Sequence, residues 1–174
     1  GFETYDDDLE PFRNESAIAE RPGEAVSRLA SRWLAGRDQR PFFLFLHYFD
    51  PHFTYAPPEP FASDYRDDLY AGEIAYTDHC IGQVISSLKE LGLYVSTLSV
   101  VTGDHGEMRD EHGETYHSYF IYQGVVRVPL VMHIPGLSRP VKLKQVVGLA
   151  DIVPTVCRLL DVALNVETSG TDLM

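Results

Sequence analysis

The sequence is short of basic residues, and this shortage excludes two classes of partner. It has 14 Lys and Arg against 26 Asp and Glu, which gives a formal net charge of −12. Nucleic acids and anionic membrane surfaces both require a positively charged protein face. We therefore expect neither as a partner. Long hydrophobic runs are missing as well, so no segment is predicted to cross a bilayer.

Cysteine is scarce, and the two that occur do not suit a disulfide framework. Cys80 and Cys157 both fall inside helical patterns and lack Cys-x-x-Cys spacing. We expect both to be small buried residues rather than disulfide partners or nucleophiles. A signal peptide and an initiating Met are absent too, so we expect a chain that begins at Gly1 to be an internal piece of a longer protein.

What is present predicts a folded domain with three helices. Of the 174 residues, 44% are hydrophobic and 11% aromatic, which suits one domain or a large part of one. Apolar residues recur at helical spacing over about residues 22–34, 70–91 and 152–160. Gly36 and Gly92 are the expected ends of the first two helices. The second helix should bury one face, made of Ile74, Ile81, Val84, Ile85 and Leu88.

Short apolar runs predict strands that are buried on both faces, as in parallel sheets. They lie at residues 42–46, 98–102 and 130–134, with a shorter one at 146–148. Helices and strands therefore alternate along the chain. This order predicts the α/β class, with a mostly parallel sheet sandwiched by helices. In such sheets, ligands bind beyond the carboxyl ends of the strands.

A carboxylate and an imidazole follow the run at 98–102. Gly103 ends that run, and Asp104 and His105 come next. Taken alone, such a pair is more often a polar turn after a strand. The residues that follow favour a site for a divalent cation instead, because they add Glu107, Glu111, His112, Glu114 and His117. Gly106 and Gly113 allow this loop to fold back over the metal position, and His117 is far enough along it to approach a bound ligand from the opposite side.

Another histidine lies beyond the run at 42–46. His52 follows Pro51, in a loop that several prolines keep irregular. It could donate a hydrogen bond to an anionic oxygen or protonate a leaving group near neutral pH. It could equally be a loop histidine packed under Pro57 and Pro58. We expect His47, at the end of the run, to have a structural or supporting role.

These segments together resemble the sulfatase family of the alkaline-phosphatase superfamily. The matching features occur in the family's order, and they are FFLFLHYFDPH (42–52), YAGEIAYTD (70–78), VTGDHGE (101–107), EHGE (111–114), RVPL (127–130), PG (135–136), ADIVPT (150–155) and GTDL (170–173). The resemblance implies the alkaline-phosphatase/sulfatase-like fold and a sulfuric ester hydrolase that uses one divalent cation, usually calcium. It also implies a small or glycan-type anionic sulfate ester as substrate, and a periplasmic or secreted location.

Four residues take roles from this resemblance. Asp104 and His105 match metal ligands, and His52 matches a histidine that contacts the sulfate group or the leaving oxygen. His117 stands where many family members have an active-site Lys, so it is the other expected catalytic residue. A Lys is permanently cationic and a His is not, which leaves the type of substrate open. Calcium is expected on family grounds, although the imidazole of His105 suits Mn²⁺ or Zn²⁺ better.

The family's nucleophile is a Cys or Ser oxidised to formylglycine within a Cys/Ser-x-Pro-x-Arg motif. Neither Cys80 nor Cys157 lies in such a motif. The family's first two aspartate ligands also belong upstream of the matched segments. The resemblance therefore implies that residues 1–174 are the second half of a catalytic domain, without the nucleophile half and the C-terminal subdomain. We expect this polypeptide alone not to turn over substrate.

Two other functions stay open at this point. A phosphodiesterase or a phosphonate monoester hydrolase of the same superfamily would share the Asp-His-Gly element, and the upstream nucleophile motif would distinguish it from a sulfatase. A catalytically dead module that holds an anionic glycan would lack the upstream aspartates and would bind no cation.

Overall fold

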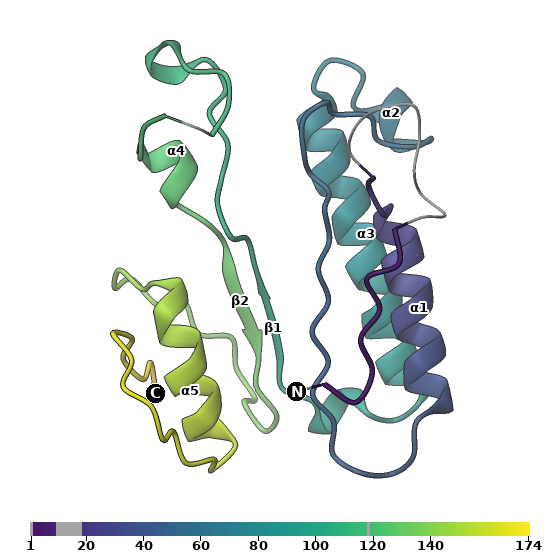
Figure 1. The fold of residues 1–174 in the computed structure, drawn as a ribbon, viewed down its shortest axis with the longest axis vertical. Helices are drawn as coiled ribbons and strands as arrows, with labels where there is room; N and C mark the ends of the chain where they lie inside the picture. Colours follow the sequence, from purple (N-terminus) through teal and green to yellow (C-terminus); the bar gives the residue numbers. More distant parts are fainter. Residues whose placement is uncertain (1, 10–18, 118) are drawn as a thin grey trace. The chain divides into compact units, whose positions relative to one another are not determined.

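The computed structural model describes residues 2–9, 19–117 and 119–174. The chain divides into two compact units, residues 1–96 and residues 97–174, here called the first and the second unit. The helices and strands of Figure 1 are α1 (Gly23–Gly36), α2 (Phe61–Asp64), α3 (Leu69–Glu90), η2 (Tyr94–Ser96), β1 (Ser99–Thr102), η3 (Glu111–Gly113), α4 (Gln123–Val126), β2 (Leu130–His133), η4 (Leu149–Asp151) and α5 (Ile152–Leu159). The three predicted helices are confirmed as α1, α3 and α5.

The first unit is built on α1 and α3, which lie side by side (Figure 1). Ala30 and Leu34 of α1 pack against Val84 and Leu88 of α3, and all four side chains are buried. Removing apolar side chains from water in this way is the main driving force for folding. This core fixes the helix pair on which the loop of His52 rests.

The predicted strand at 42–46 is extended, but it joins no ladder within the described residues. Phe42, Leu44 and Leu46 pack against the core of the two helices. Phe43 and Phe45 point the other way, and each is 70% exposed. Successive side chains of an extended chain face opposite sides, so the prediction that this run is buried on both faces is wrong for the described chain.

Helix α3 begins and ends as the sequence predicts. The Asp68 side chain caps its start by accepting a hydrogen bond from the Ala71 amide at 3.1 Å. Gly92, with φ of 69°, ends it in the left-handed region that favours glycine. The last residue of α3 is Glu90, two residues before this glycine.

The buried face of α3 differs in part from the prediction. Val84 and Leu88 are buried, whereas Ile74 is 46% exposed, so its assignment to the core is wrong. Tyr76 and Cys80 take the inner positions in its place, because spacings of four residues carry this face along the helix. Both cysteines are free, and Cys80 is fully buried, as predicted, whereas Cys157 is only partly buried, so the prediction is wrong for Cys157. Burial raises the pKa of the Cys80 thiol.

In the second unit, β1 and β2 pair antiparallel. Ser99 lies opposite His133, and Thr102 lies opposite Leu130. The mostly parallel arrangement expected from the sequence is therefore absent between the two described strands. Residues 146–148 form no strand, so that prediction is wrong.

Helix α5 carries Pro154 in its first turn, where the missing amide hydrogen costs least. Before it, the Asp151 carboxylate accepts hydrogen bonds from the Gly148 and Thr171 amides at 2.8 and 2.7 Å. These bonds tie the C-terminal segment to the start of the helix. Among the helices of the described residues, none combines the length and the apolar character needed to cross a membrane.

Two glycine substitutions on or beside α3 should change stability in opposite directions. A Cβ added at either Gly82 or Gly92 would meet no heavy atom within 4 Å, so only backbone conformation differs between the sites. Gly92→Ala should lower the free energy of unfolding by about 1 kcal/mol, because φ is positive there. Gly82→Ala should raise it by about 1 kcal/mol, because alanine is the better helix former. Urea denaturation of both variants checks this, and equal effects would contradict it.

Candidate active site

The loop after β1 places Asp104 and His105 side by side at the surface. The Asp104 carboxylate accepts a hydrogen bond from the His105 amide at 2.9 Å. The His105 ring turns its Nδ1 to the Gly106 carbonyl at 2.8 Å, so Nδ1 carries the hydrogen because a carbonyl only accepts. In the neutral ring, Nε2 then holds a lone pair, 3.9 Å from Asp104 Oδ2.

The distance between His105 Nε2 and Asp104 Oδ2 would suit a divalent cation bound between them. Two electron-pair donors that face each other are stabilised by a positive charge between them. Bonds from a divalent cation to nitrogen or oxygen are about 2.0 to 2.6 Å long, so donors 3.9 Å apart can share one ion. Within the part of the chain that the structure describes, no group of three His, Cys, Asp or Glu could hold a metal. Asp104 and His105 alone therefore do not make up a complete metal site, and their role as metal ligands stays a prediction.

His117 lies against His105, so the loop folds back, while the approach of His117 to a bound ligand stays a prediction. The two ring centroids are 3.9 Å apart and the planes are tilted by 34°. His117 Nδ1 donates to Glu107 Oε1 at 2.9 Å, and the Glu107 side chain is only 6% exposed. A carboxylate that accepts from one ring nitrogen fixes the orientation of the imidazole and directs the other nitrogen outward. Sequence reasoning included Glu107 in the cluster but missed this orienting contact.

Two close contacts hold the loop in its folded-back shape. The Gly106 amide donates to the Val125 carbonyl at 2.6 Å, and a Cβ at Gly106 would collide with the Gly124 carbonyl. Met108 is 1% exposed and packs its sulfur against Gly124. Only glycine allows this approach to α4, which explains the residue between His105 and Glu107.

The other polar residues of this loop do not join the pair as ligands. His112 stacks on Tyr122 with centroids 4.3 Å apart. The Glu111 carboxylate accepts from the Arg109 amide at 2.6 Å, and this bond lowers its pKa. Their contribution to a metal site, which the sequence suggested, receives no support from this geometry.

His52 lies in the first unit, in the loop beyond the extended run at 42–46. Its ring packs on Phe49 with centroids 4.2 Å apart, and Nδ1 donates to the Phe53 carbonyl at 2.6 Å. The Asp50–Pro51 peptide bond before it is cis. Because Asp104, His105 and His117 belong to the second unit, the convergence of all four residues stays a prediction.

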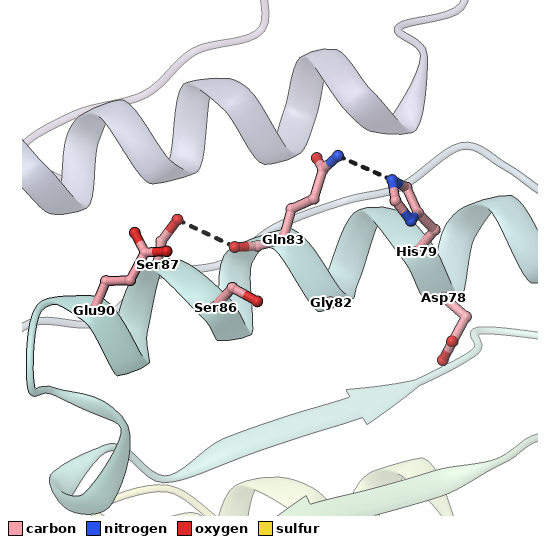
Figure 2. Close-up of a pocket in the computed structure, with 7 residues that line it drawn as sticks. All are labelled: Asp78, His79, Gly82, Gln83, Ser86, Ser87 and Glu90. Atoms are coloured by element: carbon pink, nitrogen blue, oxygen red, sulfur yellow. Dashed lines mark hydrogen bonds between the residues drawn. The ribbon is translucent and has the colours of Figure 1, made fainter.

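A polar hollow on α3 contains none of the predicted site residues. Figure 2 shows its lining side chains along one helix, with a contact of 3.1 Å between His79 Nε2 and Gln83 Nε2. Carboxylates lie at its two ends, on Asp78 and Glu90 (Figure 2). Although Asp78, His79 and Glu90 all line it, no group of three metal-ligating side chains is found here or elsewhere in the described residues.

The Glu107 contact should be visible in the tautomers of the two stacked histidines. Leucine at position 107 is similar in size to the glutamate but has no oxygen that could accept from His117 Nδ1–H, so we choose Glu107→Leu. We expect neutral His117 to shift toward its Nε2–H form, while His105 keeps Nδ1–H because the Gly106 carbonyl is unchanged. Two-bond ¹⁵N–¹H NMR of the imidazoles measures both populations in one sample. An unaltered His117 tautomer would show that Glu107 does not orient it.

Several sulfatases are similar to this chain in sequence. Arylsulfatase K of Mus musculus is 37% identical over 106 residues, which cover 61% of this chain and 19% of that protein. Steryl-sulfatase of Rattus norvegicus is 30% identical over 167 residues, which cover 86% of this chain and 29% of that protein. The chain thus spans less than a third of the length of these relatives.

Solved structures share the fold. The phosphonate monoester hydrolase of Agrobacterium radiobacter superposes with a TM-score of 0.76 and 23% identity, over 86% of this chain and 41% of that one. A protein solved in complex with its substrate D-glucosamine-2-N,6-O-disulfate gives a TM-score of 0.67 and 16% identity, over 90% of this chain and 52% of that one. These matches confirm the predicted α/β, sulfatase-like fold of a partial domain. The family model described as Sulfatase matches residues 2–162, and the chain belongs to the sulfatase family.

Proposed function

We propose that this chain is part of an enzyme that hydrolyses sulfate esters with the help of a divalent cation. The observation that carries the proposal is the cluster after β1, where Asp104, His105 and His117 are brought together by a loop folded on α4. Membership of the sulfatase family supports the same function. Since the chain spans a fifth to a third of its relatives, the activity belongs to the complete protein.

Asp104 and His105 would hold the cation, together with ligands from elsewhere in the protein. Calcium is the first candidate by family, and Mn²⁺ or Zn²⁺ would suit the imidazole of His105 better. When bound, such an ion supplies Lewis-acid stabilisation of the ester oxygens. The chain itself has a net charge of −12, so an anionic ester needs local positive charge of this kind.

His117 and His52 would donate hydrogen bonds to the transferred group and the departing oxygen. Glu107 accepts from His117 Nδ1 and stabilises the positive charge that a protonated imidazole carries. Hydrogen bonds of this type accelerate a reaction when they strengthen as charge develops in the transition state. The nucleophile, a formylglycine by family resemblance, would come from residues outside this chain.

A glycan-type sulfate ester is the substrate class we favour. One structural relative is described with D-glucosamine-2-N,6-O-disulfate as its substrate, and its fold covers 90% of this chain. Fold alone does not choose the substrate, so this choice rests on that relative.

The cation site can be tested by one substitution in the complete protein. Asp104→Ala should weaken divalent-cation binding and lower kcat/KM for an aryl sulfate by at least about a hundredfold each. Isothermal titration with Ca²⁺ and Mn²⁺ and a chromogenic assay measure the two losses separately.

Asp110→Asn is the matched control for Asp104→Ala. It removes a charge from the same loop at a residue with φ of 68°, where asparagine is tolerated. It should leave binding and activity within about twofold of the parent. Activity retained in Asp104→Ala would reject the metal assignment. A parent protein that binds no cation and cleaves no ester would indicate a dead binding module.

The runner-up function is that of a phosphonate monoester hydrolase. It is favoured by one observation, the TM-score of 0.76 to such an enzyme over 86% of this chain. An aryl sulfate and an aryl phosphonate monoester with the same leaving group distinguish the two. We expect kcat/KM to be at least about tenfold higher for the sulfate, a difference of roughly 1.4 kcal/mol in transition-state binding. The reverse preference would replace the sulfatase proposal with its runner-up.

A further inference from the structure

A buried glutamate near the start of α3 holds the loop that carries His52. The Glu73 side chain reaches across to this loop and accepts two backbone hydrogen bonds. Its Oε2 accepts from the His52 amide at 3.0 Å, and its Oε1 accepts from the Ala56 amide at 2.6 Å. One carboxylate thus binds both ends of the segment 52–56. Neither the sulfatase resemblance nor the proposed catalytic roles give this residue a task.

Burying the Glu73 carboxylate costs free energy, and its hydrogen bonds to the loop amides are what offset this cost. The residue is 4% exposed, and it has no basic partner among the residues that the structure describes. Burial raises the pKa of its carboxyl, against the opposing effect of the two amide hydrogen bonds, and the nearby Asp50 and Glu20 raise it further. Burying a carboxylate without a cation costs free energy. For helix packing alone, an apolar side chain would be more stable.

The neighbouring contacts anchor the start of the same loop. Thr77 Oγ1 lies one helical turn beyond Glu73 and donates to the Asp50 and Glu73 carbonyls at 3.2 and 2.9 Å. The Asp50 carboxylate accepts from the Gly23 amide, at the first residue of α1, at 2.9 Å. The loop is therefore tied to α3 by its backbone at residues 50, 52 and 56, and to α1 by the Asp50 carboxylate. Its position does not depend on the side chains that face solvent.

We propose that Glu73 is a positioning residue that fixes His52 for catalysis by clamping the backbone of residues 52–56. The inference rests on the proposed role of His52 in the ester hydrolase. A histidine that donates to a developing negative charge must be held within a fraction of an ångström, because small displacements of such groups reduce rates strongly. Two hydrogen bonds to a charged acceptor provide that restraint from the buried side of the loop.

The test uses Glu73→Gln in the complete protein. Glutamine has the same shape, but its NH₂ group cannot accept, so one of the two amides loses its acceptor. We expect kcat for an aryl sulfate to fall about tenfold while KM stays within about twofold. In a His52→Ala background the same substitution should cause no further loss, because the clamp acts through His52. Glu73→Asp, which keeps the charge, should recover part of the rate.

Glu90→Gln is the matched control, since it removes an exposed carboxylate from the same helix. It should leave kcat unchanged. The positioning role would be overturned if the losses of kcat from Glu73→Gln and His52→Ala multiply in the double variant. It would also be overturned if Glu73→Gln leaves kcat unchanged.

Amide hydrogen exchange provides a readout that does not depend on the reaction. Whichever of the His52 and Ala56 amides loses its acceptor should exchange about tenfold faster in Glu73→Gln than in the parent or in Glu90→Gln. Unchanged exchange would overturn the clamp. If the parent cleaves neither sulfate nor phosphonate esters, the proposed function fails, and the exchange rates still decide whether Glu73 holds this loop.

Discussion

Carboxylates that accept hydrogen bonds from backbone amides hold together the irregular parts of this chain. Loops have no ladder partners, and their buried or strained amides need an acceptor from elsewhere. Acidic side chains supply it at many places in the described residues, and five of these illustrate the pattern. The pairs are Asp50 with Gly23, Asp68 with Ala71, Glu73 with His52 and Ala56, Glu111 with Arg109, and Asp151 with Gly148 and Thr171. Part of the acidic excess is thus structural rather than a solvated surface.

The same interaction has opposite electrostatic outcomes at the surface and in the interior. Amide hydrogen bonds lower the pKa of exposed Asp151, whereas burial outweighs them and raises the pKa of Asp50 and Glu73. A raised carboxyl pKa means that the folded state binds the proton more tightly than the unfolded state. These two acids therefore favour the folded first unit most at acidic pH, and this contribution is lost as the pH rises through their raised pKa values.

Sequence patterns predicted the helices, two strand positions and the folding back of the loop after β1, because these depend on local spacing and on glycine positions. They failed where a distant partner decides the outcome. Nothing local reveals that Phe43 and Phe45 stay exposed, that Tyr76 and Cys80 replace Ile74 in the core, or that the two described strands pair antiparallel. Glu73 was missed as a functional candidate for the same reason. A lone acid on a mostly apolar helix face is the only signal, and the amides that it binds lie about twenty residues away in the sequence.

The reactivity of the buried Cys80 thiol measures how often the first unit opens. Its sulfur is shielded from solvent and lies near Gly23, where α1 begins beside α3. A thiol that is both inaccessible and held in its protonated form reacts with alkylating reagents only after the two helices separate. The rate at which Cys80 is alkylated therefore gives the rate at which α1 and α3 separate beneath the His52 loop.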